Sequence, residues 1–120
     1  GSTFWVHDEA QMDAVTAVSG SGPAYVFHFI EALRDAALAL GFSEEQARLL
    51  AIETVVGAAA LAADSTEDVT VLRQRVTSKG GTTEAALNSL NADDFKAAIL
   101  RAVRAAEARG RELGELLGKD

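Results

Sequence analysis

The sequence predicts an all-α domain, and three observations support that prediction. The chain is rich in Ala and Leu, which favour helices, and its 120 residues include a single proline, Pro23. No strand-like alternation extends beyond the short "FWV" near the start. Glycines occur mainly where apolar helical segments end. We therefore expect one helical domain whose helices are joined by short, glycine-containing turns.

The first two predicted helices meet at the segment "SGSG". A short helix is expected over residues 8–19. Pro23 has the fixed φ and the missing N–H that suit a first helical turn, so a second helix is expected from there to Leu40, ending at Gly41. His28 lies within its apolar part, where a packed imidazole bonded to a backbone carbonyl is expected rather than a catalytic base.

The third predicted helix carries the most informative pattern. Ser43 and Gln46 have the spacing of a capping box, and the helix is expected from Glu44 to about Ala63. Its middle, "LLAIETVVGAAALAA", is apolar almost all the way round, whereas a surface helix of a small monomer has a polar face. A second copy of the chain is the simplest cover, and Gly57 would permit close packing. The alternative is a central helix in a compact monomer.

Three further helices are expected in the remainder of the chain. Ser65-Thr66 offers a cap for the first of them. In the last of them, "ILRAVRAAEARGRELGELL", basic residues alternate with acids at helical spacing, which indicates a solvated face or the edge of a dimer interface. The expected ranges are 68–77, 82–90, and 91 or 93 to about 117.

Composition argues against several classes of function. Eighteen acidic and eleven basic residues give a net charge of −7, so we expect no nucleic acid and no anionic membrane as a partner. The absence of cysteine excludes disulfides and thiolate metal sites, and with only two histidines, far apart in sequence, no metal is expected. The longest unbroken apolar run, 55–63, is shorter than the roughly 18 to 20 residues of a membrane span, so a soluble protein is expected.

The N-terminus lacks the pattern of a signal peptide. Residues 1–2, Gly-Ser, look like the remnant of a cleaved purification tag. Residues 3–120 are then expected to form the domain, and the natural protein would extend upstream.

The segment "TSKGGTT", residues 77–83, is the first candidate site. Gly80 and Gly81 can adopt φ > 0 and let backbone amides converge before the next helix begins. A helix N-terminus offers unpaired N–H groups and a positive dipole end, both of which favour an anion. Hydroxyls that can donate to a carboxylate or accept from an amine are supplied by Ser78, Thr82 and Thr83. An amino acid would fit such a site. The alternative is that the segment binds nothing: its glycines end one helix, the next helix starts directly afterwards, and Glu84 only complements the dipole of that helix.

The segment "SGSGPAY", residues 19–25, is the second glycine-rich turn. It fails the dinucleotide fingerprint, because Tyr25 stands where a third glycine is needed and no strand precedes it. It also lacks the Gly-Lys-Ser/Thr ending of a P-loop. Taken alone, it is a turn leading into a proline-started helix.

Two segments together resemble a known family. "MDAVTAVSGSGPAYVFHFIEAL" and "LRQRVTSKGGTTEAAL", in this order, are similar to the C-terminal domain of the 1-pyrroline-5-carboxylate reductases, which catalyse the last step of proline synthesis. The resemblance implies a helical bundle like the C-terminal domain of 6-phosphogluconate dehydrogenase, forming an interlocked homodimer and in some members a larger ring. The family's N-terminal Rossmann domain, which binds NADPH or NADH, has no counterpart here. This domain alone is therefore expected to hold no cofactor tightly and to lack catalysis.

The resemblance also implies roles for both glycine-rich turns. The amides of Gly80–Thr83, with the Ser78 hydroxyl, would cradle the carboxylate of 1-pyrroline-5-carboxylate or proline. The hydroxyl of Thr83, the candidate catalytic residue, would lie beside the ring nitrogen. Many members have proline where this chain has Lys79. The residues expected near the nicotinamide are Ser19, Gly20, Ser21, Gly22 and Pro23.

The resulting interpretation is a cytoplasmic imino-acid-binding and dimerisation domain of such a reductase. Two alternatives remain. One is the helical domain of another small-molecule dehydrogenase, in which a different small acid would occupy the loop. The other is a purely structural oligomerisation module, in which the loop is only a turn.

Overall fold

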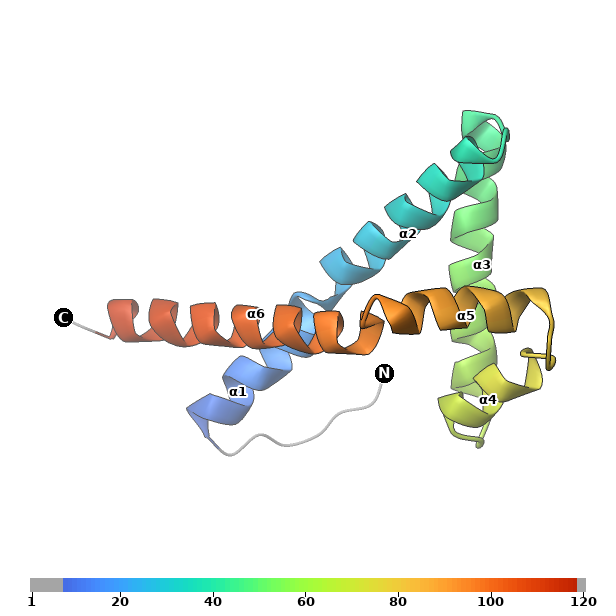
Figure 1. The fold of residues 1–120 in the computed structure, drawn as a ribbon. Helices are drawn as coiled ribbons and strands as arrows, with labels where there is room; N and C mark the ends of the chain where they lie inside the picture. The colour runs from blue at the N-terminus through green and yellow to red at the C-terminus, as the bar shows by residue number, and fades with distance from the viewer. Residues whose placement is uncertain (1–7, 119–120) are drawn as a thin grey trace. The chain divides into compact units, whose positions relative to one another are not determined.

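The structure, a computed structural model, describes residues 8–118, and all secondary structure in that range is helical (Figure 1). The prediction of an all-α domain is thus confirmed. The elements in order are α1 (Glu9–Val15), the π-helix η1 (Thr16–Gly20), α2 (Gly22–Ala39), α3 (Glu44–Asp64), α4 (Val69–Arg75), α5 (Thr82–Ala92) and α6 (Phe95–Leu117).

The chain divides into two compact units. The first comprises residues up to Tyr25 together with those from Asp94 onwards, and the second comprises Val26–Asp93. Residues 1–2, for which a tag remnant was expected, lie outside the described range, as does His7.

The first unit is built from α1, η1 and α6, which pack against one another. Asp8 caps α1 by accepting from the amide of Gln11 at 2.8 Å. The predicted helix over 8–19 is present, but its last turn widens into η1, where the amide of Ser21 donates to the carbonyl of Thr16 at 2.8 Å. Ala17 is buried, and its carbonyl accepts from the Tyr25 hydroxyl at 2.7 Å. Tyr25 therefore ties the start of α2 to the π-helix.

The turn between α2 and α3 ends one helix and starts the next as predicted. Gly41 has a φ of 100°, and the amide of Phe42 donates to the carbonyl of Ala37 at 3.2 Å, as in a Schellman motif. The predicted capping box is confirmed: Ser43 and Gln46 exchange hydrogen bonds of 3.0 and 3.2 Å between side chain and backbone.

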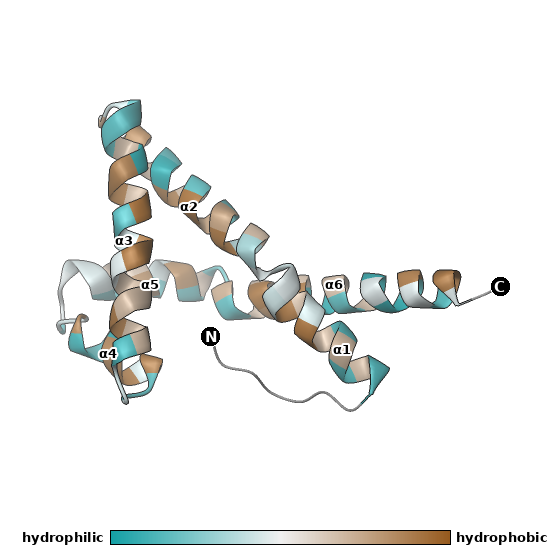
Figure 2. Ribbon diagram, turned by 180° about the vertical axis from the view of Figure 1, so that it is seen from behind, coloured by the Kyte–Doolittle hydropathy of each residue, from teal (hydrophilic) through white to brown (hydrophobic). Residues whose placement is uncertain are grey.

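Hydrophobic residues occupy much of α3 (Figure 2). Most of its apolar side chains are exposed. Only Ala47 and Ala51 of this helix are buried. Leu49, Val56 and Leu61 are 54%, 61% and 69% exposed. The alternative of a central helix covered within a compact monomer is therefore wrong for this structure.

By length and composition α3 could also cross a membrane, and it is the one described helix that meets this criterion. The longest unbroken apolar run did not indicate this, because Glu53 and Thr54 interrupt the apolar sequence of α3 although the helix as a whole carries few charges. A helix that packs against another protein chain meets the same criterion, so the finding alone does not indicate a membrane.

The last three helices begin and end within a few residues of their predicted limits. Asp68 caps α4, and its bond from the backbone amide of Thr70, 3.0 Å long, lowers the pKa of its carboxyl. Helix α6 starts at Phe95, later than predicted, because Asp94 has a left-handed φ of 54° and separates it from α5. Most of the alternating charges on α6 are exposed, as expected, and Glu107 is half-buried. They include an Arg109–Glu112 pair at 2.9 Å.

Candidate functional site

The first candidate site is the loop between α4 and α5 in the second unit. Gly80 has a φ of 75°, a left-handed conformation that disfavours residues with a Cβ. Gly81 is extended and forms the N-cap of α5, so only one of the two glycines takes the predicted positive φ. The chain leaves α4, turns at Gly80 and enters α5 directly at Thr82. The predicted break between two helices is therefore confirmed.

The amides of this loop fall into two groups. Gly80 donates to the Glu84 carboxylate at 3.1 Å, and Gly81 donates to the Ser78 carbonyl at 3.0 Å. In contrast, within the described chain the amides of Thr82, Thr83 and Glu84 have no acceptor, because Gly81 has no side chain to cap them. Three unpaired donors at the start of an 11-residue helix favour an anion.

The hydroxyls of the loop are also divided. The Thr77 hydroxyl donates to the carbonyl of Arg73 at 2.6 Å, within the preceding helix. Between residues 8 and 118, nothing bonds the hydroxyls of Ser78, Thr82 or Thr83; Thr83 is half-buried and the other two are exposed. These hydroxyls are available to a ligand that combines a carboxylate with a polar nitrogen.

The loop is packed tightly against its own backbone at one point. A Cβ added to Gly81 would lie 3.2 Å from the Ser78 carbonyl oxygen and 3.4 Å from the Ser78 hydroxyl oxygen. The structure thus brings the five predicted substrate-binding residues into one short segment: Ser78, Gly80, Gly81, Thr82 and Thr83. Lys79 is exposed, and no ion pair holds it in the described part of the chain.

The second candidate segment belongs to the first unit. Ser19 and Gly20 are part of η1, and Gly22 and Pro23 begin α2. The Ser19 hydroxyl donates to the carbonyl of Val15 at 2.9 Å and is therefore used within the helix. Because no strand precedes this segment among residues 8–118, it does not fit the phosphates of a dinucleotide in the usual way.

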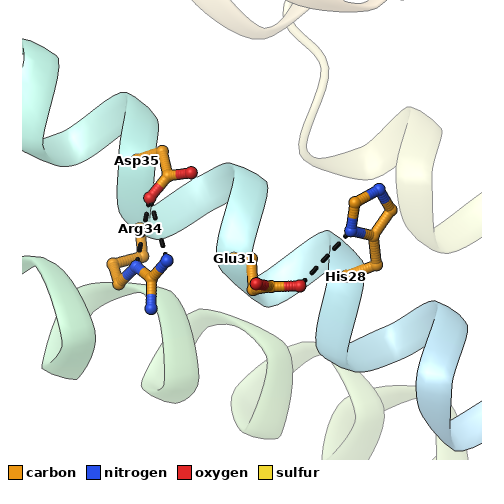
Figure 3. A network of polar contacts seen from close by, with 4 residues as sticks. All are labelled: His28, Glu31, Arg34 and Asp35. Carbon is orange, nitrogen blue, oxygen red and sulfur yellow. Dashed lines mark hydrogen bonds and ion pairs between the residues drawn. The ribbon is translucent and has the colours of Figure 1, made fainter.

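His28 is not the packed residue that its apolar neighbours indicated. Its side chain is 89% exposed and lies 3.3 Å from the Glu31 carboxylate, one turn along α2. The next pair on the same helix is Arg34 and Asp35, 3.1 Å apart (Figure 3). The prediction failed because the burial of a helix face depends on its partners and not on the helix alone. No cluster of metal-ligating side chains occurs within the described residues.

The family profile described as pyrroline-5-carboxylate reductase dimerisation matches residues 9–113. The chain belongs to this family. Pyrroline-5-carboxylate reductase of Pseudomonas aeruginosa is 50% identical to it over 119 residues, which are 99% of this chain and 44% of that protein. The chain therefore spans less than half the length of the relatives it matches, and aligns with one domain of them.

Solved structures of the same family share its fold. A pyrroline-5-carboxylate reductase from Coxiella burnetii is 45% identical, with a TM-score of 0.90 over 94% of this chain and 42% of that one. A Plasmodium falciparum pyrroline carboxylate reductase, solved with NADP bound, is 38% identical, with a TM-score of 0.86 over 90% of this chain and 41% of that one. The resemblance noted from the two sequence segments is thereby confirmed.

The contact between Glu84 and Gly80 was missed from the sequence. Glu84 was considered only as a complement to the helix dipole, whereas its carboxylate accepts from a backbone amide two residues before the helix. A usable signal was present. Glu84 is the third helical residue after Gly81, which is the position from which a capping box reaches back.

Proposed function

We propose that this chain is the dimerisation and imino-acid-binding domain of an enzyme that reduces 1-pyrroline-5-carboxylate to L-proline with NADPH or NADH in the cytoplasm. The observation that carries the proposal is the α4–α5 loop. Its three unpaired amides and three free hydroxyls lie in the segment by which the chain resembles the family. The names of the relatives support the reaction.

The substrate's two polar groups match the two kinds of donor in the loop. The expected cradle of amides over Gly80–Thr83 narrows to its second half, because the amides of Gly80 and Gly81 already have acceptors. The substrate carboxylate would accept from the unpaired amides of Thr82, Thr83 and Glu84, with help from the Ser78 hydroxyl. The Thr83 hydroxyl, at the half-buried position of the segment, would lie beside the ring nitrogen and orient the C=N bond. Binding and orientation are then the main tasks of this chain.

The nicotinamide cofactor would supply hydride to the imine carbon from outside the described residues, which contain no Rossmann elements. The proposed position of Ser19, Gly20, Ser21, Gly22 and Pro23 is near the nicotinamide end of that cofactor. Two of these five residues, Gly20 and Gly22, have no Cβ and would allow a close approach of backbone to ligand. We expect no tightly bound cofactor on this chain alone.

The partner that we propose for α3 is a second copy of the chain. The exposed apolar side chains of α3 favour burial against another apolar surface. The matching family profile is described as a dimerisation domain. Beyond the backbone of α3 itself and the two adjacent residues, nothing in residues 8–118 lies within 4 Å of the place where a Cβ on Gly57 would stand, so a neighbouring helix can approach closely there. Two copies would form an interlocked homodimer, and such dimers could assemble further into a ring.

Replacing Thr83 by alanine tests the site. Loss of one hydroxyl that bonds a polar nitrogen is expected to weaken L-proline binding roughly tenfold, while the dimer stays intact. Thr83→Ser keeps the hydroxyl and should bind nearly as the unaltered chain does. Affinity is measured by calorimetry and association by sedimentation. Unchanged proline binding by Thr83→Ala would remove Thr83 from the site.

The same experiment separates the alternatives. If the domain belonged to another small-molecule dehydrogenase, L-proline would not bind while a different small acid would. If the chain were only a structural module, neither would bind and the dimer would still form.

A further inference from the structure

Glu84 makes a contact that a residue with only a dipole role does not need. Its carboxylate accepts from the amide of Gly80 at 3.1 Å, and Gly80 precedes the N-cap of α5. A carboxylate that merely complemented the helix dipole would be satisfied by solvent at the first turn. Instead the half-buried Glu84 bridges from the helix back across the turn.

The hydrogen bonds of the turn explain why the Glu84 side chain bonds the amide of Gly80. In a capping box the third helical residue accepts from the amide of the N-cap residue. Here that amide, of Gly81, already donates to the Ser78 carbonyl at 3.0 Å. Glu84 therefore bonds one residue earlier and holds Gly80 in the left-handed conformation that the turn requires.

The contact also determines which amides remain for a ligand. Because the amides of Gly80 and Gly81 already have acceptors, the loop donors left without one among residues 8–118 are the amides of Thr82, Thr83 and Glu84, which start α5. These three are adjacent in the first turn of a helix and point in one general direction. A carboxylate bound there would not have to break either internal bond.

We infer that Glu84 is a positioning residue of the imino-acid site. By holding the amide of Gly80, it keeps the Ser78–Gly81 turn folded against α5 and assigns the amides of Thr82, Thr83 and Glu84 to the substrate carboxylate. The inference rests on the proposed function of this loop. The Glu84 side chain does not itself contact the substrate. Its negative charge opposes the substrate carboxylate, so the site uses the acceptor oxygen of this side chain and not its charge.

Another helix of this chain shows that an uncharged glutamine can make the kind of bond that Glu84 makes. At the start of α3, Gln46 occupies the same third helical position, and its side-chain oxygen accepts from the amide of Ser43 at 3.0 Å. Glutamine at position 84 can therefore make the bond to Gly80 without the charge. This gives a variant that should rescue the function that alanine loses.

The test is the L-proline affinity of the full 120-residue chain and its Glu84→Ala and Glu84→Gln variants, measured by NMR titration. Glu84→Ala is expected to weaken binding roughly fivefold, the size typical of one lost hydrogen bond. Glu84→Gln is expected to bind as tightly as the unaltered chain or more tightly. The control is Glu45→Ala, which removes an exposed first-turn acid from α3 and should change nothing.

Each other outcome overturns the inference. If Glu84→Ala bound as well as the unaltered chain, the contact would have no positioning role, and tighter binding would make Glu84 a competitor for the site. If Glu84→Gln were as weak as Glu84→Ala, the charge and not the acceptor would matter. If the unaltered chain failed to bind L-proline, the proposed function would fall, and the inference with it.

Discussion

Replacing Val56 by aspartate should convert the associated form of this protein into single chains. Val56 is 61% exposed on α3, so the substitution buries no charge within one chain. In a dimer that covers α3, each copy would place a carboxylate in a dry interface, at a cost of several kcal/mol per dimer. The dissociation constant is expected to rise by roughly a hundredfold or more.

Sedimentation velocity over a concentration series measures this effect, and far-UV circular dichroism checks that the helices persist. Val56→Ala is the matched control, because it removes only methyl groups and should weaken the dimer far less. A Val56→Asp chain as dimeric as the unaltered one would mean that α3 does not form the interface at this position.

The second large effect is expected at Gly80. Valine there would have to adopt a φ of 75°, which a β-branched residue disfavours by roughly 1–2 kcal/mol or more. Apart from the two adjacent residues, the described part of the chain places nothing within 4 Å of the added Cβ, so the strain is conformational and not crowding by more distant residues. The turn is expected to refold, separating Gly80 from Glu84, and L-proline binding should fall below detection.

Two variants calibrate the Gly80 result. Gly80→Asn should retain part of the affinity, because asparagine tolerates the left-handed region. Gly114→Val places the same side chain at an uncrowded glycine of α6 and should leave binding intact. Full proline binding by Gly80→Val would show that the left-handed turn is not needed by the site.

Local signals explain why most of the helices could be predicted. Ser43 with Gln46, and Gly41 before them, act within a few residues, and each behaves in the structure as its residue type indicates. Asp94 was the exception, since its left-handed φ moved the start of α6 beyond the predicted position. The π-helical geometry of η1 was not predicted. In the structure η1 packs against α6 and accepts from the Tyr25 hydroxyl, and both contacts involve residues outside the segment.

Features that depend on distant partners could not be predicted in the same way. The exposure of His28 follows from what covers α2 and not from its own apolar neighbours. The loop residues Ser78 and Thr83 were found because they are adjacent in sequence, but the bond from Gly80 to Glu84 depends on how tightly the turn closes. Sequence thus indicated which residues form the candidate site and left open which donors are free.

The proposed imino-acid site is tested most directly by titrating the isotope-labelled chain with L-proline and following its backbone amide NMR shifts, with acetate as a control for nonspecific anions. The prediction is saturating shifts within residues 78–84 with L-proline and not with acetate, largest at Thr82, Thr83 and Glu84. Absence of shifts there, in a sample shown to be folded and dimeric, would contradict the assignment of this loop as the site in the chain.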